Sequence, residues 1–323
     1  MNILVTGCAG FIGFHVCLKL LENKKINLLG IDNLNKYYDV NLKLQRLASL
    51  KKKSKAKQFK FSKIDIINKK KLFTFFKKNK IDYVIHLAAQ AGVRYSIKYP
   101  EKYFESNLKG FFNILECSRK NNIKHLIFAS TSSVYGNSKK FPLTEDLNTD
   151  KPISFYAATK KSNEVMAYSY SYIYNLPSTG LRFFTVYGPN GRPDMSLFKF
   201  VKSIKSKKEI SVFNNGKHTR DFTFINDVVD AINKLILKPP INNNPPFNIL
   251  NIANGNPRKL IDFIKLIEKN LNMKSVKKKL PMQMGDVPKT HGDIRKIKKL
   301  INYNPKTSIE KGINIFVKWY LNK

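Results

Sequence analysis

The sequence predicts an α/β protein with a Rossmann-like, doubly wound parallel sheet and a smaller, mixed α/β C-terminal lobe. Three observations carry this prediction. Apolar strand-like runs alternate with helix-length segments in the first half of the 323-residue chain, a glycine-rich turn follows the first run, and the alternation becomes irregular and proline-rich after residue 180. Near-continuous apolar strands separated by helices are typical of a parallel sheet covered on both faces.

The elements follow in chain order from these patterns. Strands are expected at residues 2–6, 26–31, 59–64, 83–88 and 125–130, and helices at residues 11–23, 101–121, 156–174, 260–271 and 308–320. We expect a large first domain over residues 1–180, to which about residues 219–240 return. Residues 181–323 should form most of the smaller lobe.

The composition indicates a globular protein with a strongly basic surface. Hydrophobic residues make up 42% of the chain, and 59 Lys and Arg against 22 Asp and Glu give a formal charge of +37. Of these 59 basic residues all but eight are lysines, and they are spread over most of the helices. A nucleic-acid-binding protein, in contrast, usually clusters its basic residues and favours arginine. We therefore expect a solvated surface that attracts small anions and binds no specific nucleic acid.

Location is predicted from what the sequence lacks. The three cysteines lie far apart and form no metal-type pair, so we expect reduced thiols and no metal site. The first residues carry no basic leader pattern, and no uncharged run reads as a membrane span. These features favour a cytoplasmic protein that is not bound to a membrane.

A dinucleotide site is predicted at the first glycine-rich turn. Gly7, Gly10 and Gly13 follow the first strand at three-residue intervals and open the first helix. This spacing permits a tight turn, a close backbone approach to a pyrophosphate and close helix–strand packing. Asp32 ends the second strand 19 residues after Gly13, near the spacing of about 20 for a carboxylate that binds the adenosine ribose. A carboxylate there repels a 2′-phosphate, so the sequence favours NAD over NADP.

A candidate catalytic group follows the fifth strand. Tyr156 and Lys160 are four residues apart at the start of a predicted helix and share a face. Oxidation of an alcohol by NAD needs a base, and the reference pKa of tyrosine, about 10, is too high for that role. A nearby ammonium stabilises the phenolate and lowers that pKa. Thr131 or a neighbouring serine, at the end of the strand, would orient the substrate hydroxyl.

These features together resemble the extended short-chain dehydrogenase/reductase superfamily. Longer strings are similar to its UDP-glucuronate 4-epimerase branch, which belongs to the NAD-dependent epimerase/dehydratase family. They are residues 32–39 (DNLNKYYD), 90–96 (QAGVRYS), 181–189 (LRFFTVYGP), 191–195 (GRPDM), 220–223 (RDFT), 285–288 (GDVP) and 304–308 (NPKTS). The similarity covers nearly the whole chain and implies NAD-dependent, reversible C4 epimerisation of a UDP-sugar.

The resemblance also implies roles for individual residues. The first domain would bind NAD through Gly7, Gly10, Phe11, Ile12, Gly13, Asp32, Asp65, Ile66, Leu87, Ala88, Ala89, Gln90 and Lys160. The catalytic residues would be Tyr156 as base, Lys160 and Thr131. The substrate would be bound by Thr131, Ser132 and Ser133, by Thr185 and Arg192 at the sugar carboxylate, and by Arg94, Arg220 and Asp286 at the nucleotide end.

Neighbouring reactions are disfavoured at the hydroxyl cluster. A 4,6-dehydratase would need an Asp-Glu pair where Ser132 and Ser133 stand, and a UDP-glucuronate decarboxylase usually carries a glutamate at the position of Ser133. The alternatives that stay open are a UDP-glucose 4-epimerase, another nucleotide-sugar epimerase or decarboxylase, and a catalytically silent nucleotide-binding interaction protein. Intact Tyr156 and Lys160 argue against the last of these.

Two further expectations come from the family pattern. Helices at about residues 101–121 and 156–174 would supply a homodimer interface of four helices. His218 departs from the pattern, and we expect it to be a tolerated surface substitution, not a catalyst.

Overall fold

The protein is represented by a computed structural model that describes residues 1–55 and 58–322. It divides into two compact units. The first unit contains Met1–Gly136, Asn148–Arg182 and Val229–Leu250. The second contains Asn137–Leu147, Phe183–Val228 and Asn251–Lys323.

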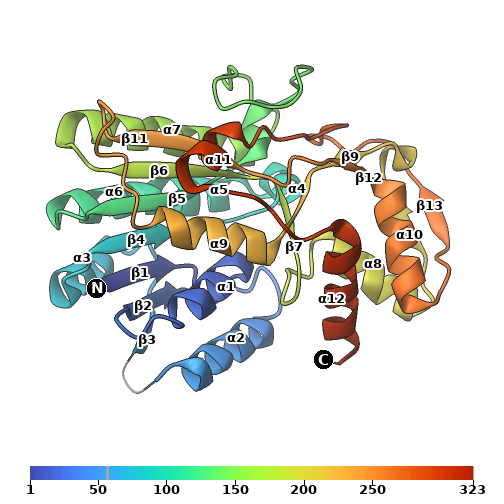
Figure 1. The fold of residues 1–323 in the computed structure, drawn as a ribbon, viewed down its shortest axis with the longest axis horizontal. Helices are drawn as coiled ribbons and strands as arrows, with labels where there is room; N and C mark the ends of the chain where they lie inside the picture. The colour runs from blue at the N-terminus through green and yellow to red at the C-terminus, as the bar shows by residue number, and fades with distance from the viewer. Residues whose placement is uncertain (56–57, 323) are drawn as a thin grey trace. The chain divides into compact units, whose positions relative to one another are not determined.

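The first unit is built on a seven-stranded sheet in the order β11-β6-β5-β4-β1-β2-β3 (Figure 1). Its strands are β1 (Asn2–Thr6), β2 (Asn27–Asp32), β3 (Phe59–Lys63), β4 (Tyr83–His86), β5 (His125–Thr131), β6 (Ser178–Phe183) and β11 (Phe247–Ile252). The pairs β1–β2, β1–β4, β2–β3 and β4–β5 are parallel. The predicted Rossmann-like α/β fold is therefore confirmed.

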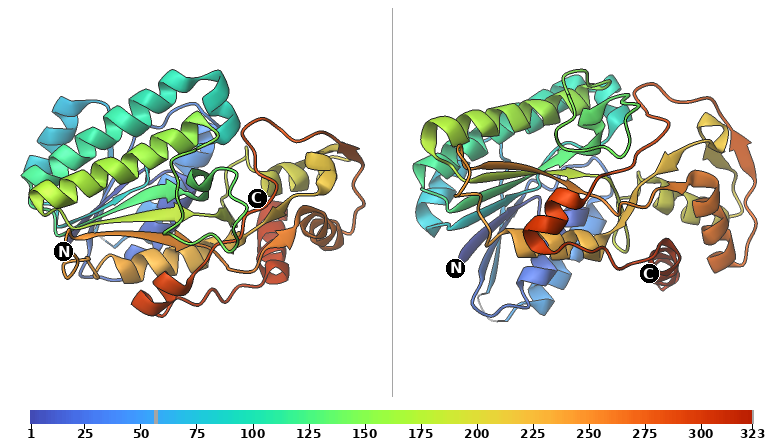
Figure 2. Two further views of the ribbon diagram at one scale, coloured as in Figure 1. Left: turned by 90° about the horizontal axis from the view of Figure 1, so that it is seen from above. Right: turned by 45° about the horizontal axis from the view of Figure 1, so that its top comes forward.

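Helices cover both faces of this sheet. They are α1 (Phe11–Leu20), α2 (Val40–Lys53), α3 (Lys69–Asn79), α4 (Val93–Lys98), α5 (Pro100–Tyr103), α6 (Gly110–Lys120), α7 (Phe155–Tyr174) and α9 (Ile225–Leu235). Figure 2 shows α3, α6 and α7 together on one face of the sheet and α1 and α9 on the other. Because helices pack on both faces of the sheet, both faces of each central strand are buried. This explains why the strand sequences are near-continuous apolar runs.

The core of the first unit lies between the sheet and the layer of α3, α6 and α7. Phe76, Phe111 and Phe128 are fully buried there, together with Leu4 and Val84 of the central strands. Burying a large apolar side chain stabilises a fold by about 1.5–3 kcal/mol. This packing holds the carboxyl ends of the strands, where ligands of parallel sheets bind, in a fixed arrangement.

The helix expected over residues 101–121 is interrupted by a π-helical turn. The chain runs from α5 into a π-helix, η1 (Phe104–Lys109), and then into α6. A single π-helical turn inside an α-helix often marks a functional site. The prediction of one regular helix is wrong in this detail, because apolar spacing alone does not reveal a widened turn.

The second unit is a mixed α/β arrangement of short strands and helices. Its elements are β7 (Thr185–Tyr187), α8 (Ser196–Lys205), β8 (Ile210–Val212), η3 (Asn214–Gly216), β9 (Thr219–Arg220), β10 (Phe222–Phe224), β12 (Arg258–Lys259), α10 (Leu260–Leu271), β13 (Lys277–Lys279), α11 (Arg295–Ile301) and α12 (Ile309–Leu321). Three two-stranded pairs form among them, β7–β10, β9–β12 and β8–β13. Phe222 and Phe263 stack at 4.1 Å in its core.

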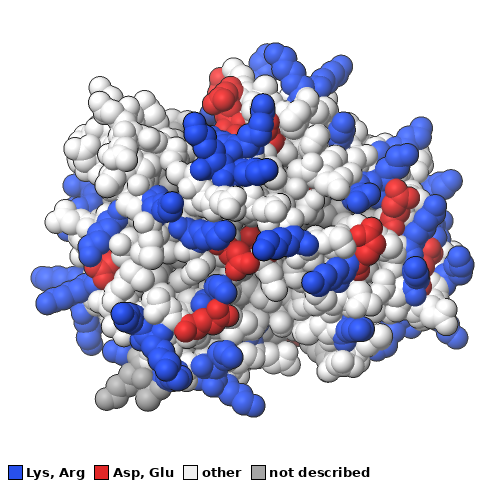
Figure 3. All heavy atoms as spheres, in the orientation of Figure 1, with Lys and Arg blue, Asp and Glu red and all other residues white. Residues whose placement is uncertain are grey.

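Element positions agree closely with the sequence patterns. The helix at Leu260–Leu271 has the expected bounds, and α7 begins one residue before the expected start, after the cap Ser154. Figure 3 shows lysine and arginine side chains scattered over the face in view and not gathered in one patch. Across the described residues, no helix combines the length and the hydropathy that a membrane span requires.

Candidate active site

The glycine turn between β1 and α1 has the geometry predicted for it. Gly7 has a φ of +70°, and a Cβ there would lie 2.8 Å from the backbone nitrogen of Ala88. A Cβ at Gly13 would lie 2.1 Å from the carbonyl oxygen of Gly7, so that position also accepts only glycine. Gly10 caps α1 without a side-chain hydrogen bond, which leaves the helix N-terminus to backbone N–H groups. This is the arrangement that binds phosphate oxygens.

Asp32 lies beside the glycine turn, at the end of β2. It is 8% exposed and accepts hydrogen bonds from the backbone N–H of Ala9 at 3.2 Å and of Leu34 at 2.8 Å. Burial raises the pKa of this carboxyl, while the Leu34 N–H and the cations of Lys43 and Arg46 act in the opposite direction. The carboxylate is thus held in place, as a ligand of ribose hydroxyls has to be.

The residues predicted to flank adenine lie after β3, the next strand of the sheet. Asp65 accepts a hydrogen bond from the Asn33 side chain at 2.8 Å, which ties the ends of β2 and β3 together. Ile66 is 5% exposed, and its carbonyl oxygen accepts from the Asn113 side chain at 2.9 Å. The structure therefore brings Asp32 and Asp65 to neighbouring strand ends of the first unit.

The segment after β4 contains the residues predicted to form the wall of the cofactor site. The backbone N–H groups of Leu87 and Ala88 both donate to Thr6 Oγ1, at 3.2 and 3.1 Å. Gln90 is bound twice by Asn107 of the π-helical turn: its N–H donates to Asn107 Oδ1 at 2.8 Å, and its carbonyl accepts from Asn107 Nδ2 at 3.0 Å. The widened turn thus fixes the position of Gln90.

Tyr156 and Lys160 both lie in the first two turns of α7. Ser154 caps this helix by accepting from the N–H of Ala157, and the N–H of Tyr156 donates to Ser96 Oγ at 3.1 Å. The Tyr156 ring packs edge-on against Tyr103 at 6.0 Å. The chain therefore holds Tyr156 through both its backbone and its ring.

Lys160 is a buried cation. Its side chain is 2% exposed, and Nζ donates to the carbonyl oxygen of Ala129 in β5 at 3.0 Å. Burial lowers the pKa of Lys160 to about 8, and the carboxylate of Glu164 acts in the opposite direction. Near neutral pH the side chain therefore keeps its charge by a narrow margin.

The hydroxyl cluster follows directly after β5. Thr131 is 7% exposed, accepts a hydrogen bond from the Ser133 N–H and donates to Ser133 Oγ, both at 3.2 Å. Ser132 and Ser133 begin a short 3₁₀-helix, η2 (Ser132–Tyr135), and both are partly exposed. Because Ala129 belongs to the same strand, one segment supplies both the acceptor for Lys160 and the hydroxyl cluster.

Arg94, the predicted nucleotide-end residue of the first unit, lies in α4. The other predicted substrate residues lie in the second unit, where Thr185 begins β7 and Arg220 ends β9. Arg220 Nη2 donates to Asp286 Oδ1 at 2.7 Å, so these two residues are paired. Arg192 makes a bidentate pair with Asp194, at 3.0 and 2.9 Å.

The expectation that His218 lies at the surface is wrong. Its side chain is buried, and Nε2 lies 3.6 Å from Asp286 Oδ2, on the carboxylate that also binds Arg220. Its neighbours Lys217 and Thr219 do not indicate burial, because polar residues surround it in the sequence. Its carbonyl oxygen accepts a hydrogen bond from the backbone N–H of Leu260 at 2.8 Å, which ties it to the start of α10.

The described residues hold no group of three or more His, Cys, Asp or Glu side chains that could bind a metal ion. The glycine turn, the uncapped helix N-terminus and the buried Asp32 instead fit a dinucleotide. A model of the NAD dependent epimerase/dehydratase family matches residues 3–253, well over half of the chain. The chain belongs to this family. Its predicted family membership is therefore confirmed.

Full-length relatives narrow the family. The chain is 46% identical to protein CapI of Staphylococcus aureus, over 99% of this chain and 98% of that protein. It is 44% identical to UDP-glucuronate 4-epimerase of Thermodesulfobacterium geofontis, over 98% of this chain and 95% of that protein.

Two solved structures of nucleotide-sugar 4-epimerases match the fold over the full length of the chain. UDP-glucuronic acid 4-epimerase of Bacillus cereus, in complex with UDP-glucuronic acid and NAD, matches with a TM-score of 0.92 and 33% identity, over 100% of this chain and 99% of that one. UDP-glucose 4-epimerase of Thermotoga maritima matches with a TM-score of 0.87 and 31% identity, over 100% of this chain and 99% of that one.

Sequence reasoning missed several residues that support the site of this family member. Asn107 holds Gln90, and Lys43 and Arg46 lie close enough to Asp32 to act on its pKa. Glu164 could have been predicted, because it follows Lys160 by four residues and therefore shares its face of the helix. Asn107 had none, because a polar residue in a helix is usually solvated.

Proposed function

We propose that the chain is an NAD-dependent UDP-glucuronate 4-epimerase, an isomerase that interconverts UDP-glucuronate and UDP-galacturonate through a 4-keto intermediate. The observation that carries this is the full-length match, at a TM-score of 0.92, to the Bacillus cereus enzyme of that name with UDP-glucuronic acid and NAD. The relative of that name in Thermodesulfobacterium geofontis, 44% identical, supports the same activity. The predicted function and cofactor agree with both.

The first unit carries the residues that would hold NAD. Its pyrophosphate would face the turn at Gly7–Gly10–Gly13 with Phe11 and Ile12, and Asp32 would bind the adenosine ribose. Adenine would lie against Asp65 and Ile66, and the residues beside the nicotinamide half would be Leu87, Ala88, Ala89, Gln90 and Lys160. When bound, NAD would accept the hydride from C4 of the sugar. The reduced cofactor would give it back to the opposite face of C4.

Tyr156 is the base in this proposal. Its phenolate takes the proton of the C4 hydroxyl while the carbon is oxidised and gives that proton back when the carbon is reduced. The ammonium of Lys160, on the same face of α7, stabilises the phenolate. Thr131 orients the C4 hydroxyl toward Tyr156.

The hydroxyl cluster selects epimerisation over elimination. Neither Ser132 nor Ser133 carries a carboxyl group, so these two positions cannot supply the acid and base that removal of water from the sugar requires. Turning of the 4-keto sugar within the site needs no additional group. The same two hydroxyls would bind the sugar carboxylate together with Thr185 and Arg192.

Holding this carboxylate protects the intermediate. A 4-keto uronic acid is a β-keto acid and loses carbon dioxide when the breaking bond aligns with the carbonyl π system. Arg192 already holds the carboxylate of Asp194, and a guanidinium has five donors, so it can bind a second carboxylate. Arg94, Arg220 and Asp286 would serve the nucleotide end.

A homodimer formed through α6 and α7 belongs to the same proposal. Large apolar side chains are exposed along these helices, among them Phe112 at 41%, Val165 at 56% and Tyr172 at 68%. Exposed apolar side chains of this size, gathered on two helices, are typical of association sites. The three cysteines, Cys8, Cys17 and Cys117, are buried free thiols, which suits the reducing cytoplasm.

The decisive experiment incubates the purified protein with UDP-glucuronate and follows the anomeric protons by NMR. Growth of UDP-galacturonate to a mixed equilibrium without net NADH is the expected result. Persistent UDP-glucuronate, with turnover of UDP-glucose after NAD is added, would assign the second candidate, a UDP-glucose 4-epimerase. A UDP-pentose product would mean that the argument from Ser133 is wrong.

A further inference from the structure

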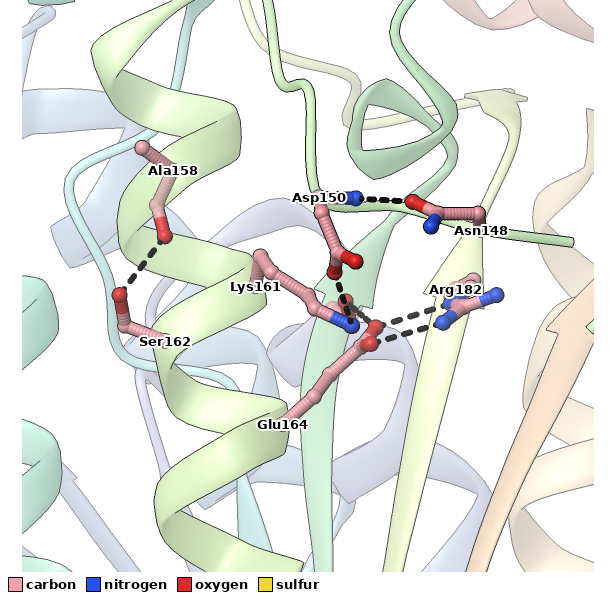
Figure 4. Close-up of polar contacts among 8 residues, drawn as sticks. Asn148, Asp150, Ala158, Lys161, Ser162, Glu164 and Arg182 are labelled. Carbon is pink, nitrogen blue, oxygen red and sulfur yellow. Dashed lines mark hydrogen bonds and ion pairs between the residues drawn. The ribbon is translucent and has the colours of Figure 1, made fainter. Parts of the chain in front are cut away.

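A buried ion pair lies one helical turn beyond Lys160. Glu164 accepts from Arg182 of β6 through both of its oxygens, at 2.9 Å from Nε and 2.8 Å from Nη2 (Figure 4). Each side chain of this pair is 4% exposed. A bidentate, buried pair fixes the orientation of the carboxylate far better than a surface pair does.

The same carboxylate is tied to the strand that carries the hydroxyl cluster. Ser130 Oγ donates to Glu164 Oε1 at 2.5 Å. Ser130 stands between Ala129, whose carbonyl binds Lys160, and Thr131, which begins the hydroxyl cluster. Three successive residues of β5 therefore contact the lysine, the carboxylate and the cluster in turn.

Spacing places Glu164 on the face of α7 that carries the catalytic pair. Tyr156, Lys160 and Glu164 follow at intervals of four residues, and both Lys160 and Glu164 are buried. The next lysine along the helix, Lys161, forms its own ion pair and lies 3.7 Å from Asp150 (Figure 4). The four-residue interval therefore relates Glu164 to Lys160, while the ammonium of Lys161 is paired elsewhere.

We propose that Glu164 is a positioning residue of the active site: held by Arg182 and Ser130 one helical turn beyond Lys160, its carboxylate keeps Lys160 charged, so that the ammonium stabilises the Tyr156 phenolate. The proposal rests on the proposed function, since it assumes the roles given there to Tyr156 and Lys160. A buried pair is weak evidence for stability alone, because well-packed apolar residues often serve a fold as well. An electrostatic effect on Lys160 would explain why the protein contains the buried pair of Glu164 and Arg182.

The other groups around Lys160 do not supply this charge. His86 of β4 is buried, and burial together with the Lys160 charge keeps its pKa well below the ordinary value, so it stays neutral. Arg182 is a cation and lies under the ring of Tyr135 at 4.8 Å. Tyr156 carries negative charge only as the phenolate. Glu164 is therefore the carboxylate that offsets the burial of Lys160.

The test is Glu164→Gln in the full-length protein, with two readouts. In the first, the pH profile of kcat for C4 epimerisation should narrow: its basic limb should move to lower pH by about one unit, because Lys160 loses its proton more readily. In the second, the ultraviolet titration of Tyr156 in the protein without substrate, isolated by subtracting Tyr156→Phe in the same background, should move to higher pH. An unmoved basic limb and an unmoved tyrosine titration would overturn the proposal.

Matched variants separate this role from a structural one. Glu268 is also buried and accepts from a lysine and a serine, Lys277 and Ser275, so Glu268→Gln should lower stability without moving either pH readout. If Glu164→Gln does not fold because Arg182 is left unpaired, Glu164→Gln combined with Arg182→Gln removes both charges. Loss of the Arg182 cation raises the pKa of Lys160 and partly offsets the loss of the carboxylate, so the double variant should show a smaller shift of the basic limb to lower pH than Glu164→Gln. A shift to higher pH in the double variant would overturn the proposal.

The readouts also separate this proposal from the proposed function. A wild-type protein without activity on UDP-glucuronate would reject that function, while the titration of Tyr156 would still report whether Glu164 acts through Lys160. Glu164→Asp keeps the charge and should restore most of the wild-type titration. A merely structural role gives no reason for such rescue.

Discussion

At the scale of single residues, the site depends on how burial and charge are balanced. Lys160 is almost fully buried, and its pKa is lowered to about 8, so the surrounding protein decides whether it carries charge at neutral pH. Asp32 is in the opposite position: burial raises the pKa of its carboxyl, and backbone N–H groups and cations counteract this. For both groups, the pKa shift caused by burial is partly offset by neighbouring charges or hydrogen-bond donors.

Removing the base should abolish most of the activity. In Tyr156→Phe we expect kcat to fall by about 100-fold or more, because general-base catalysis contributes roughly 10²–10⁴. The ring contact with Tyr103 does not need the hydroxyl, so the variant should fold. NMR rates with UDP-glucuronate measure the loss, and unchanged binding of UDP is the control. Near-normal turnover would assign the base to another group.

Replacing Arg192 should weaken binding of the uronic acid specifically. A charge-assisted hydrogen bond is worth about 1.5–3 kcal/mol, so Arg192→Ala should raise the KM for UDP-glucuronate by roughly 10- to 100-fold. Some UDP-pentose should appear as the carboxylate escapes its constraint. Affinity for UDP alone should stay the same. Full activity on the uronic acid would show that Arg192 does not bind its carboxylate.

At the scale of elements, the first unit is joined by polar contacts that cross between strands and helices. Asn107 in the π-helical turn bonds Gln90 and Thr159, and Asn163 of α7 donates to the carbonyl of Asn107 at 2.7 Å. These bonds tie the cofactor wall to the helix that carries the catalytic pair. Buried polar networks of this kind specify one arrangement when every member is bonded.

The buried side chain of His125 should make the free energy of unfolding depend on pH. His125 of β5 donates from Nδ1 to the carbonyl oxygen of Ile236 at 3.1 Å, and its Nε2 lies 2.8 Å from the hydroxyl oxygen of Thr179 in β6. Burial lowers its pKa from 6.5 to about 4, so the unfolded chain binds the proton more tightly. This contribution to stability is complete above pH 6.5 and is lost as pH falls toward 4.

The loss amounts to at most about 3 kcal/mol for this single group. Denaturant unfolding at several pH values should show the free energy of unfolding decreasing over that window. His125→Asn keeps the donor to Ile236 without a titrating ring, so it should be less stable at pH 7 and show a flatter pH dependence. Equal slopes in both proteins would contradict the argument.

The exposed apolar face of α7 should control association. Val165 and Tyr172 are seven residues apart, on one face of the helix, and both are well exposed. Val165→Glu combined with Tyr172→Lys should convert a dimer into a monomer by light scattering. Ile241, which is 67% exposed in a loop, gives the matched control, since Ile241→Glu should leave the mass unchanged. A monomeric wild-type protein would reject the proposed interface.

At the scale of the whole molecule, the formal charge of +37 should act on the substrate. A strongly basic protein attracts an anionic nucleotide sugar, and salt screens this attraction. We expect kcat/KM for UDP-glucuronate to fall several-fold as salt is raised, with kcat nearly constant. A kcat/KM that is independent of salt would mean that the lysines serve only the solvated surface.

Much of the fold could be predicted from local patterns. Strand and helix periodicity predicted five strands of the central sheet but not β6 and β11, and Leu260–Leu271 has the expected bounds. The glycine turn and Asp32 were predictable because their geometry follows from residues close together in the sequence. The expected helix at residues 101–121 was wrong at its π-helical turn, since apolar spacing does not record a change of hydrogen-bond pattern.

Patterns within short segments of the sequence predicted the α/β class, the glycine turn and the proposed catalytic pair Tyr156 and Lys160, because alternation, glycine spacing and helical spacing are local properties. The contacts of Glu164 with Arg182 and Ser130, and the burial of His218 beside Asp286, are visible only in the folded protein. These partners lie up to tens of residues apart, and burial changes their energies far more than composition does. Charge at such positions is a property of packing, which no single segment of the chain contains.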